Sequence, residues 1–144
     1  MVVAVIDGLG GGLGAEIVSR LRSALPRQVE IIALGTNAIA TERMLKARAN
    51  RGASGENAIR VTVQSADFIV GPIGIVIPNS MLGEITPEIA QTVVAAPGVK
   101  LLLPVEQSHL QIMGIEPKSL GEHIESAIDE IVRQARLSPP VSQA

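Results

Sequence analysis

The stretch Val2-Val3-Ala4-Val5-Ile6-Asp7-Gly8-Leu9-Gly10-Gly11-Gly12-Leu13-Gly14 joins an apolar run to a glycine-rich loop through one aspartate. Residues 14–25 follow with apolar side chains at helical spacing, and Pro26 ends the pattern. A strand, a glycine loop and a helix in this order are typical of nucleotide binding. Glycines let backbone N–H groups approach a phosphate, and the helix N-terminus favours an anion. The stretch therefore predicts a nucleotide or dinucleotide ligand.

The rest of the chain alternates between strand and helix patterns, which predicts βαβ units. The expected fold is an α/β, Rossmann-like three-layer sandwich with a mainly parallel sheet. Residues 51–57 read as a polar loop that leads through a helical turn to the third strand. The strands are expected at residues 2–6, 29–34, 67–70 and 99–103, with a short edge strand at 109–113, and the helices at 14–25, 38–49, 87–96 and 119–136.

Length and composition limit the function classes. The 144 residues fit a single domain over residues 1–136, followed by a disordered tail at 137–144. The net charge of −2 and the lack of Trp and Tyr give no case for a nucleic-acid partner. The lack of Cys excludes disulfides, thiol catalysis and cysteine-bound zinc.

Location and assembly follow from similar arguments. No signal peptide precedes Asp7, and no apolar run approaches the ~20 residues that span a bilayer, so we expect a soluble cytoplasmic protein with no membrane partner. We also expect a homo-oligomer, because an apolar α/β unit of this size often needs a partner to cover an edge strand or an outer helix.

The glycine loop excludes two familiar chemistries. A P-loop needs a lysine directly after the glycines, and the first lysine is Lys46. The spacing Gly8-x-x-x-Gly12-x-Gly14 occurs in short-chain dehydrogenases, but their proton donor is a tyrosine and this chain has none. The similarity therefore extends to cofactor binding only. The residues expected to hold the phosphates are Gly8, Gly10, Gly11, Gly12, Leu13 and Gly14.

The expected cofactor is NAD or NADP. Many NAD-binding folds carry an acidic residue after the second strand, where this chain has Gly35, Thr36 and Asn37. Without that carboxylate, Thr36, Asn37 and Arg43 could donate to a 2′-phosphate, although Thr36 and Asn37 are equally good helix caps. A second wall of the site is expected from the turn that contains Gly71, Pro72 and Gly74.

Asp7 and Glu56 are the candidate catalytic residues. Asp7 could fix the loop by accepting backbone N–H groups, hold Mg²⁺ or touch the ligand directly. A haloacid-dehalogenase motif would need a second Asp at position 9, where Leu9 stands. Glu56 could act as a base or bind a ribose, or it could simply begin a helix. One alternative function is therefore an enzyme that uses Asp7 or Glu56, with Mg²⁺, on a small phosphorylated or carboxylated metabolite.

Other polar residues favour structural roles. Glu84 precedes a helix start, where compensation of the helix dipole explains it as well as catalysis does. His109 and His123 are isolated, so no metal ligands are assigned. The absence of Tyr and Cys, the scarcity of His and the small size support another alternative, a non-catalytic sensor or assembly subunit.

Four segments together resemble a small bacterial family of unknown function that is found mostly in anaerobes. They are residues 4–12, 32–38, 55–59 and 71–77, and the resemblance extends over about residues 2–131. It implies that the four loops form one unit. It implies no activity, substrate or catalytic residue.

Overall fold

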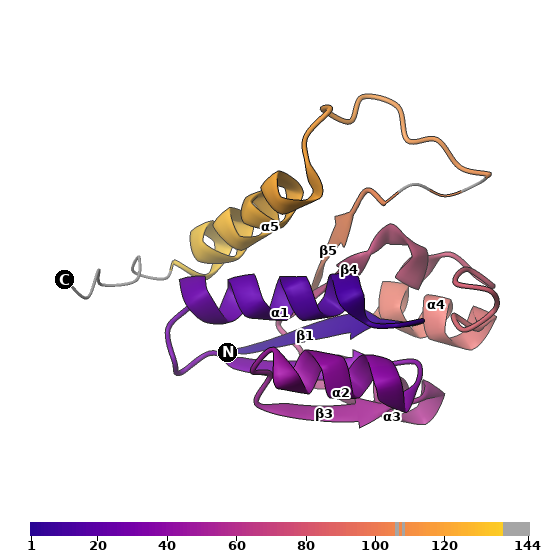
Figure 1. Ribbon diagram of the computed structural model, residues 1–144, viewed down its shortest axis with the longest axis horizontal. Helices are drawn as coiled ribbons and strands as arrows, with labels where there is room; N and C mark the ends of the chain where they lie inside the picture. The colour runs from indigo at the N-terminus through magenta and orange to yellow at the C-terminus, as the bar shows by residue number, and fades with distance from the viewer. Residues whose placement is uncertain (106, 108, 137–144) are drawn as a thin grey trace.

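The structure, a computed structural model, describes residues 1–105, 107 and 109–136. Parallel strands form a five-stranded sheet in the order β3-β2-β1-β4-β5 (Figure 1). The strands are β1 (Val2–Asp7), β2 (Glu30–Gly35), β3 (Arg51–Ser54), β4 (Phe68–Pro72) and β5 (Val99–Leu103). From β1 the chain adds β2 and β3 on one side of the sheet and then crosses over to add β4 and β5 on the other side, so the strand order reverses between β1 and β4. In sheets of this kind the ligand crevice lies outside the carboxyl ends of the strands at that reversal.

Helices cover both faces of the sheet (Figure 1). One face carries α1 (Gly12–Ala24), α2 (Ala38–Lys46) and α5 (Leu120–Ala135), and the other carries α3 (Glu56–Thr62), α4 (Pro87–Ala95) and the 3-10 turns η1 (Val63–Ser65) and η2 (Ile73–Val76). Side chains of β1 alternate between the two cores, with Val3 and Val5 in one and Ala4 and Ile6 in the other. The α/β Rossmann-like prediction is therefore confirmed.

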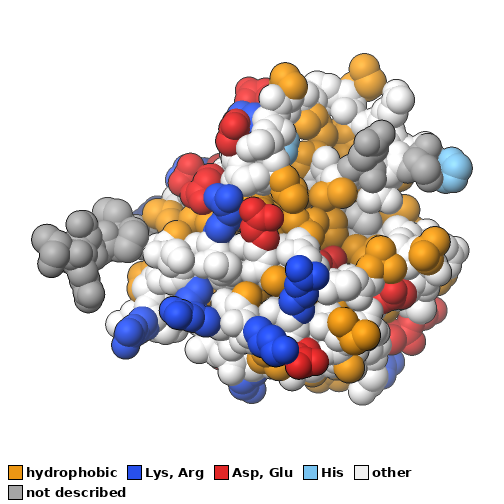
Figure 2. Space-filling model, viewed as in Figure 1, with side chains coloured by type: hydrophobic (Ala, Val, Ile, Leu, Met, Phe, Trp, Pro, Cys, Tyr) orange, Lys and Arg blue, Asp and Glu red, His pale blue; other side chains and the backbone are white. Residues whose placement is uncertain are grey.

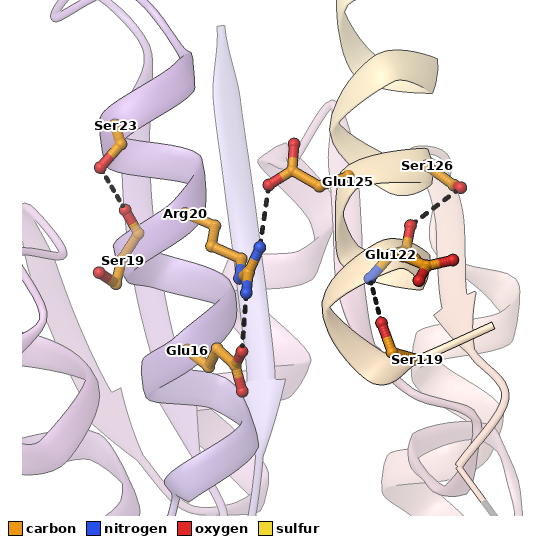
Figure 3. A network of polar contacts seen from close by, with 8 residues as sticks. All are labelled: Glu16, Ser19, Arg20, Ser23, Ser119, Glu122, Glu125 and Ser126. Atoms are coloured by element: carbon orange, nitrogen blue, oxygen red, sulfur yellow. Dashed lines mark hydrogen bonds and ion pairs between the residues drawn. The ribbon is translucent and has the colours of Figure 1, made fainter.

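Helix α5 returns to the α1 face after a long excursion of the chain. Its buried residues include Ile124, Ile128 and Ile131. Arg20 of α1 adds an ion pair to Glu125 at 3.1 Å and one to Glu16 at 3.2 Å (Figure 3). Exposed ion pairs contribute at most about 1 kcal/mol, so burial of the isoleucines is the main stabilisation.

The edge strand β5 has the predicted bounds, but the sheet differs from the prediction in two other places. Residues 51–54, expected as a loop, form β3, which pairs with β2 although its side chains are mostly exposed. The edge strand predicted at 109–113 is wrong. The segment leaves the sheet after β5 and pairs with none of the described strands (Figure 1). It makes a single described bridge, between Gln107 and Leu110. Alternating side chains do not make a strand without a partner.

Smaller differences concern the boundaries. The helix expected over 38–49 ends at Lys46, and Arg48 beyond it has a left-handed φ of 83°. The predicted tail at 137–144 lies outside the described residues. Among the helices that the structure describes, none is long and apolar enough to cross a membrane.

Candidate functional site

The glycine loop connects β1 to α1 through a tight turn. Gly11 has a left-handed φ of 73°, and its N–H donates to the carbonyl of Gly8 at 3.0 Å. A methyl group placed on Gly11 would lie 2.6 Å from Cα of Ala40, so only glycine lets α1 begin this close to α2. Gly10 is open by comparison, since the nearest atom to a methyl there would be Nη1 of Arg43 at 3.9 Å.

Asp7 fixes this loop. Its Oδ1 accepts the N–H of Gly8 at 2.8 Å, and its Oδ2 accepts the N–H of Gly14 at 2.6 Å. Burial raises the pKa of Asp7, and repulsion by Glu84 adds to the rise, whereas the two N–H bonds and Arg43 oppose it. Of the three roles predicted for Asp7, the structure therefore shows the one in which its carboxylate fixes the turn by accepting loop N–H groups. Its roles as a Mg²⁺ ligand or a ligand contact stay predictions.

The loop leaves some backbone donors without an acceptor. The N–H groups of Gly8, Gly11 and Gly14 are already used inside the loop. In contrast, no described residue accepts a hydrogen bond from the backbone N–H of Gly10, Gly12 or Leu13. Unsatisfied N–H groups at a helix start are the donors that bind anions at such sites.

Arg43 brings a positive charge to the same place. It extends from α2, and its Nη1 lies 3.4 Å from the carbonyl oxygen of Gly10. The same nitrogen lies 3.4 Å from where a methyl on Gly12 would stand. Within the described part of the chain, no carboxylate forms an ion pair with Arg43. Arg43 therefore stands beside the free N–H groups with its charge available.

Glu84 joins the glycine loop to the end of β2. Its Oε1 accepts three hydrogen bonds, from the hydroxyl of Thr36 at 2.5 Å, the amide nitrogen of Asn37 at 2.7 Å and the N–H of Leu9 at 3.1 Å. The bond from Thr36 lowers the pKa of Glu84 most, those from Asn37 and Leu9 add to the fall, and partial burial opposes it. Glu84 is therefore ionised at neutral pH.

Asn37 holds the same junction from the other side. Its Nδ2 donates to the carbonyl of Leu9 at 2.9 Å, and its Oδ1 accepts the N–H of Ala40 at 2.8 Å as the N-cap of α2. The structure thus brings together the glycine loop and the Thr36–Asn37 pair, as expected. Hydrogen bonds from Thr36 and Asn37 fix the orientation of the Glu84 carboxylate.

Sequence reasoning did not place Glu84 in the site. The residue lies 47 positions beyond Asn37 and follows a turn in which Asn79, Met81 and Leu82 have left-handed φ values. Asn favours that conformation but Met and Leu do not, so the sequence of this turn does not predict its backbone. The sequence offered one signal for it. No acidic residue directly follows β2, so a carboxylate from a distant segment could fill that position.

The other predicted loops make no described hydrogen bond to the glycine loop, although Gly71 lies against Ile6 of β1. Glu56 begins α3, and its Oε1 accepts the hydroxyl of Thr86. Gly71 and Pro72 are buried in β4, and Gly74 accepts the hydroxyl of Ser80 at 2.5 Å. No hydrogen bond between described residues links these groups to the glycine loop. Their ligand-binding and catalytic roles stay predictions.

An apolar groove of about 280 Å³ lies at the carboxyl ends of β4 and β5. Its lining includes Ile73 and Ile77 after β4, Pro104 and Val105 after β5, and Ile112. Figure 2 shows hydrophobic side chains at the surface of this part of the molecule, between α5 and the segment that precedes it. The described residues contain no group of three or more His, Cys, Asp or Glu side chains placed to hold a metal ion.

The fold and the loop define a Rossmann-like α/β protein with a glycine-rich β1–α1 turn. Residues 2–136 match the domain of unknown function DUF3842, and the chain belongs to that family. The resemblance to a family of unknown function is thereby confirmed. No curated protein matches the chain.

The solved structures that are similar to the chain include the following two. A dodecameric FMN-dependent UbiX-like decarboxylase from Escherichia coli O157:H7 has a TM-score of 0.49 and 14% identity, with 99% of this chain and 98% of that one covered. A nucleoside-diphosphate-sugar epimerase from Pseudomonas aeruginosa has a TM-score of 0.45 and 18% identity, with 97% of this chain and 50% of that one covered.

Proposed function

We propose that the protein binds a nucleotide, and that the nucleotide is a dinucleotide such as NAD(P). The observation that carries the proposal is the set of free N–H groups of Gly10, Gly12 and Leu13 beside the guanidinium of Arg43. These groups would hold the phosphates. Backbone donors at a helix start and an arginine are the groups that most often bind phosphate in proteins.

The position of these donors in the fold supports the proposal. They lie at the carboxyl end of β1, beside the point where the strand order reverses. That is where doubly wound sheets bind their ligands. Asp7 supports the same site, because its two hydrogen bonds hold the loop in one shape before a ligand arrives.

The apolar groove favours a dinucleotide over a mononucleotide. One nucleotide half would lie over β1 and β2, beside Arg43 and Glu84. The other half would extend across the reversal toward β4 and β5, where Ile73, Ile77 and Pro104 line the groove. Flat rings bind well in pockets with apolar walls and few polar groups.

Catalysis by Asp7 or Glu56 receives no comparable support. Both oxygens of Asp7 accept backbone N–H groups, and Oε1 of Glu56 accepts the hydroxyl of Thr86. The enzyme with Mg²⁺ and the non-catalytic sensor or assembly subunit stay alternatives, and no described contact favours either.

Calorimetric titration with NAD tests the proposal through Arg43. We expect Arg43→Gln to weaken binding about 10- to 100-fold, because a charge-assisted hydrogen bond is worth roughly 1.5–3 kcal/mol. Arg48→Gln is the matched control, since Arg48 is also exposed, follows the same helix and makes no described ion pair. It should leave the affinity unchanged.

Two results would contradict the proposal. One is equal affinity of the wild type and Arg43→Gln for NAD. The other is the absence of any thermal stabilisation by NAD, NADP, FAD, ATP or AMP at millimolar concentration. A ligand present at about 100 times its Kd should add roughly 2.7 kcal/mol to the free energy of unfolding.

A further inference from the structure

We propose that Glu84 accepts the ribose hydroxyls of the bound nucleotide and thereby selects a cofactor with a free 2′-hydroxyl, which means NAD rather than NADP. The inference rests on the proposed function and identifies its ligand more closely. It assigns to a residue after β4 a task that dinucleotide-binding folds usually give to an acidic residue after the second strand.

The position of Glu84 is the first support. The end of β2 and the residues just after it would normally carry the ribose-binding acid, and here this stretch is Gly35, Thr36 and Asn37. Glu84 reaches this position from another loop, because its Oε1 is bonded to both Thr36 and Asn37. A carboxylate is therefore present at the end of β2 although the β2 sequence lacks one.

The second support is the state of the two carboxylate oxygens. All three described donors converge on Oε1 of Glu84, and no described residue donates to Oε2. The three bonds fix the orientation of the side chain and leave the second oxygen able to accept. A vicinal ribose diol offers two O–H donors to such an acceptor.

The third support is that two of the three donors expected for a 2′-phosphate, Thr36 and Asn37, are already used, while the third, Arg43, lies beside the glycine loop and is assigned to the phosphates held there. The hydroxyl of Thr36 donates to Glu84, and the amide of Asn37 donates to Glu84 and to the carbonyl of Leu9. A 2′-phosphate placed here would meet an ionised carboxylate and would lack those donors. These contacts therefore favour NAD over the 2′-phosphate of NADP, which the missing acid after β2 would suit.

Calorimetric titration of the wild type, Glu84→Gln and Glu88→Gln with NAD and with NADP tests the inference. We expect the wild type to bind NAD at least about tenfold more tightly than NADP. Glu84→Gln should weaken NAD binding about tenfold and remove most of the preference. Gln keeps a carbonyl oxygen for the three donors, so the loop should retain its shape. Glu88→Gln removes the same charge from an exposed site in the first turn of α4 and should change neither affinity.

The outcomes separate the two proposals. Equal affinity of the wild type for NAD and NADP, tighter NADP binding, or an unchanged preference in Glu84→Gln would overturn the role of Glu84 and leave nucleotide binding intact. Failure of the wild type to bind either ligand would overturn the proposed function itself. If Glu84→Gln does not fold, ADP-ribose and its 2′-deoxy form are compared on the wild type. The deoxy form should bind about tenfold more weakly, and equal affinity would overturn the inference.

Discussion

At the scale of single residues, Gly11 decides how close two helices can start. Its left-handed backbone and its contact with Ala40 leave no room for a side chain. We expect Gly11→Ala to lower the free energy of unfolding by about 2–4 kcal/mol, because backbone strain and overpacking each cost roughly 1–3 kcal/mol. Urea unfolding followed by circular dichroism would measure the change.

Gly10→Ala is the matched control. A methyl at Gly10 would come no closer than 3.9 Å to Nη1 of Arg43, the one neighbour within contact distance. Its effect on unfolding should stay within about 0.5 kcal/mol. The methyl would nevertheless stand among the proposed phosphate donors, so NAD binding should weaken. Similar losses of stability in both variants would contradict this account of the loop.

The contacts of Asp7 could be predicted from the sequence, whereas those of Glu84 could not. One role predicted for Asp7, fixing the turn through loop N–H groups, depends on local geometry, and the bonds to Gly8 and Gly14 confirm it. The contacts of Glu84 depend on a turn with left-handed residues and on packing between distant segments. No local pattern encodes such contacts, so the sequence explained Glu84 equally well by helix-dipole compensation and by catalysis, and did not place it beside Thr36 and Asn37.

At the scale of elements, the strands with apolar runs were predictable, including the edge strand β5, whereas the polar edge strand β3 was not. Strands β1, β2 and β4 have apolar runs because both faces are covered. Strand β3 has the sequence Arg51-Gly52-Ala53-Ser54, and its strand form depends on the free edge of β2. Residues 109–113 alternate as strands do, but they pair with none of the described strands. Edge strands are set by their neighbours more than by their own side chains.

Helix α5 offers an element-scale prediction. Ile131 is fully buried between this helix and the α1 side of the sheet, with 0% of its surface exposed. Ile131→Ala should lower the free energy of unfolding by about 3 kcal/mol through lost burial and a cavity. Ile39→Ala removes the same atoms from a side chain that is 69% exposed and should cost under about 0.5 kcal/mol. Urea titration of both variants compares them, and equal losses would contradict the packing described for α5.

At the scale of the whole molecule, the described surface retains apolar side chains near the segment after β5. Met113 is 86% exposed and Leu82 is 96% exposed. Such side chains fit the homo-oligomer expected from the sequence, which stays a prediction. Sedimentation velocity would measure it, and a single species of 15.0 kDa would contradict it.

For the whole molecule, the central claim is that the glycine loop between β1 and α1, beside the point where the strand order reverses, binds the phosphates of a nucleotide. An amide NMR titration of the full chain with NAD tests it most directly, because it observes the proposed donors one by one. We predict that the amide signals of Gly10, Gly12 and Leu13 shift together and saturate, while those of Gly8 and Gly14, which Asp7 already holds, move less. Unchanged signals from Gly10, Gly12 and Leu13 at millimolar NAD would contradict the claim.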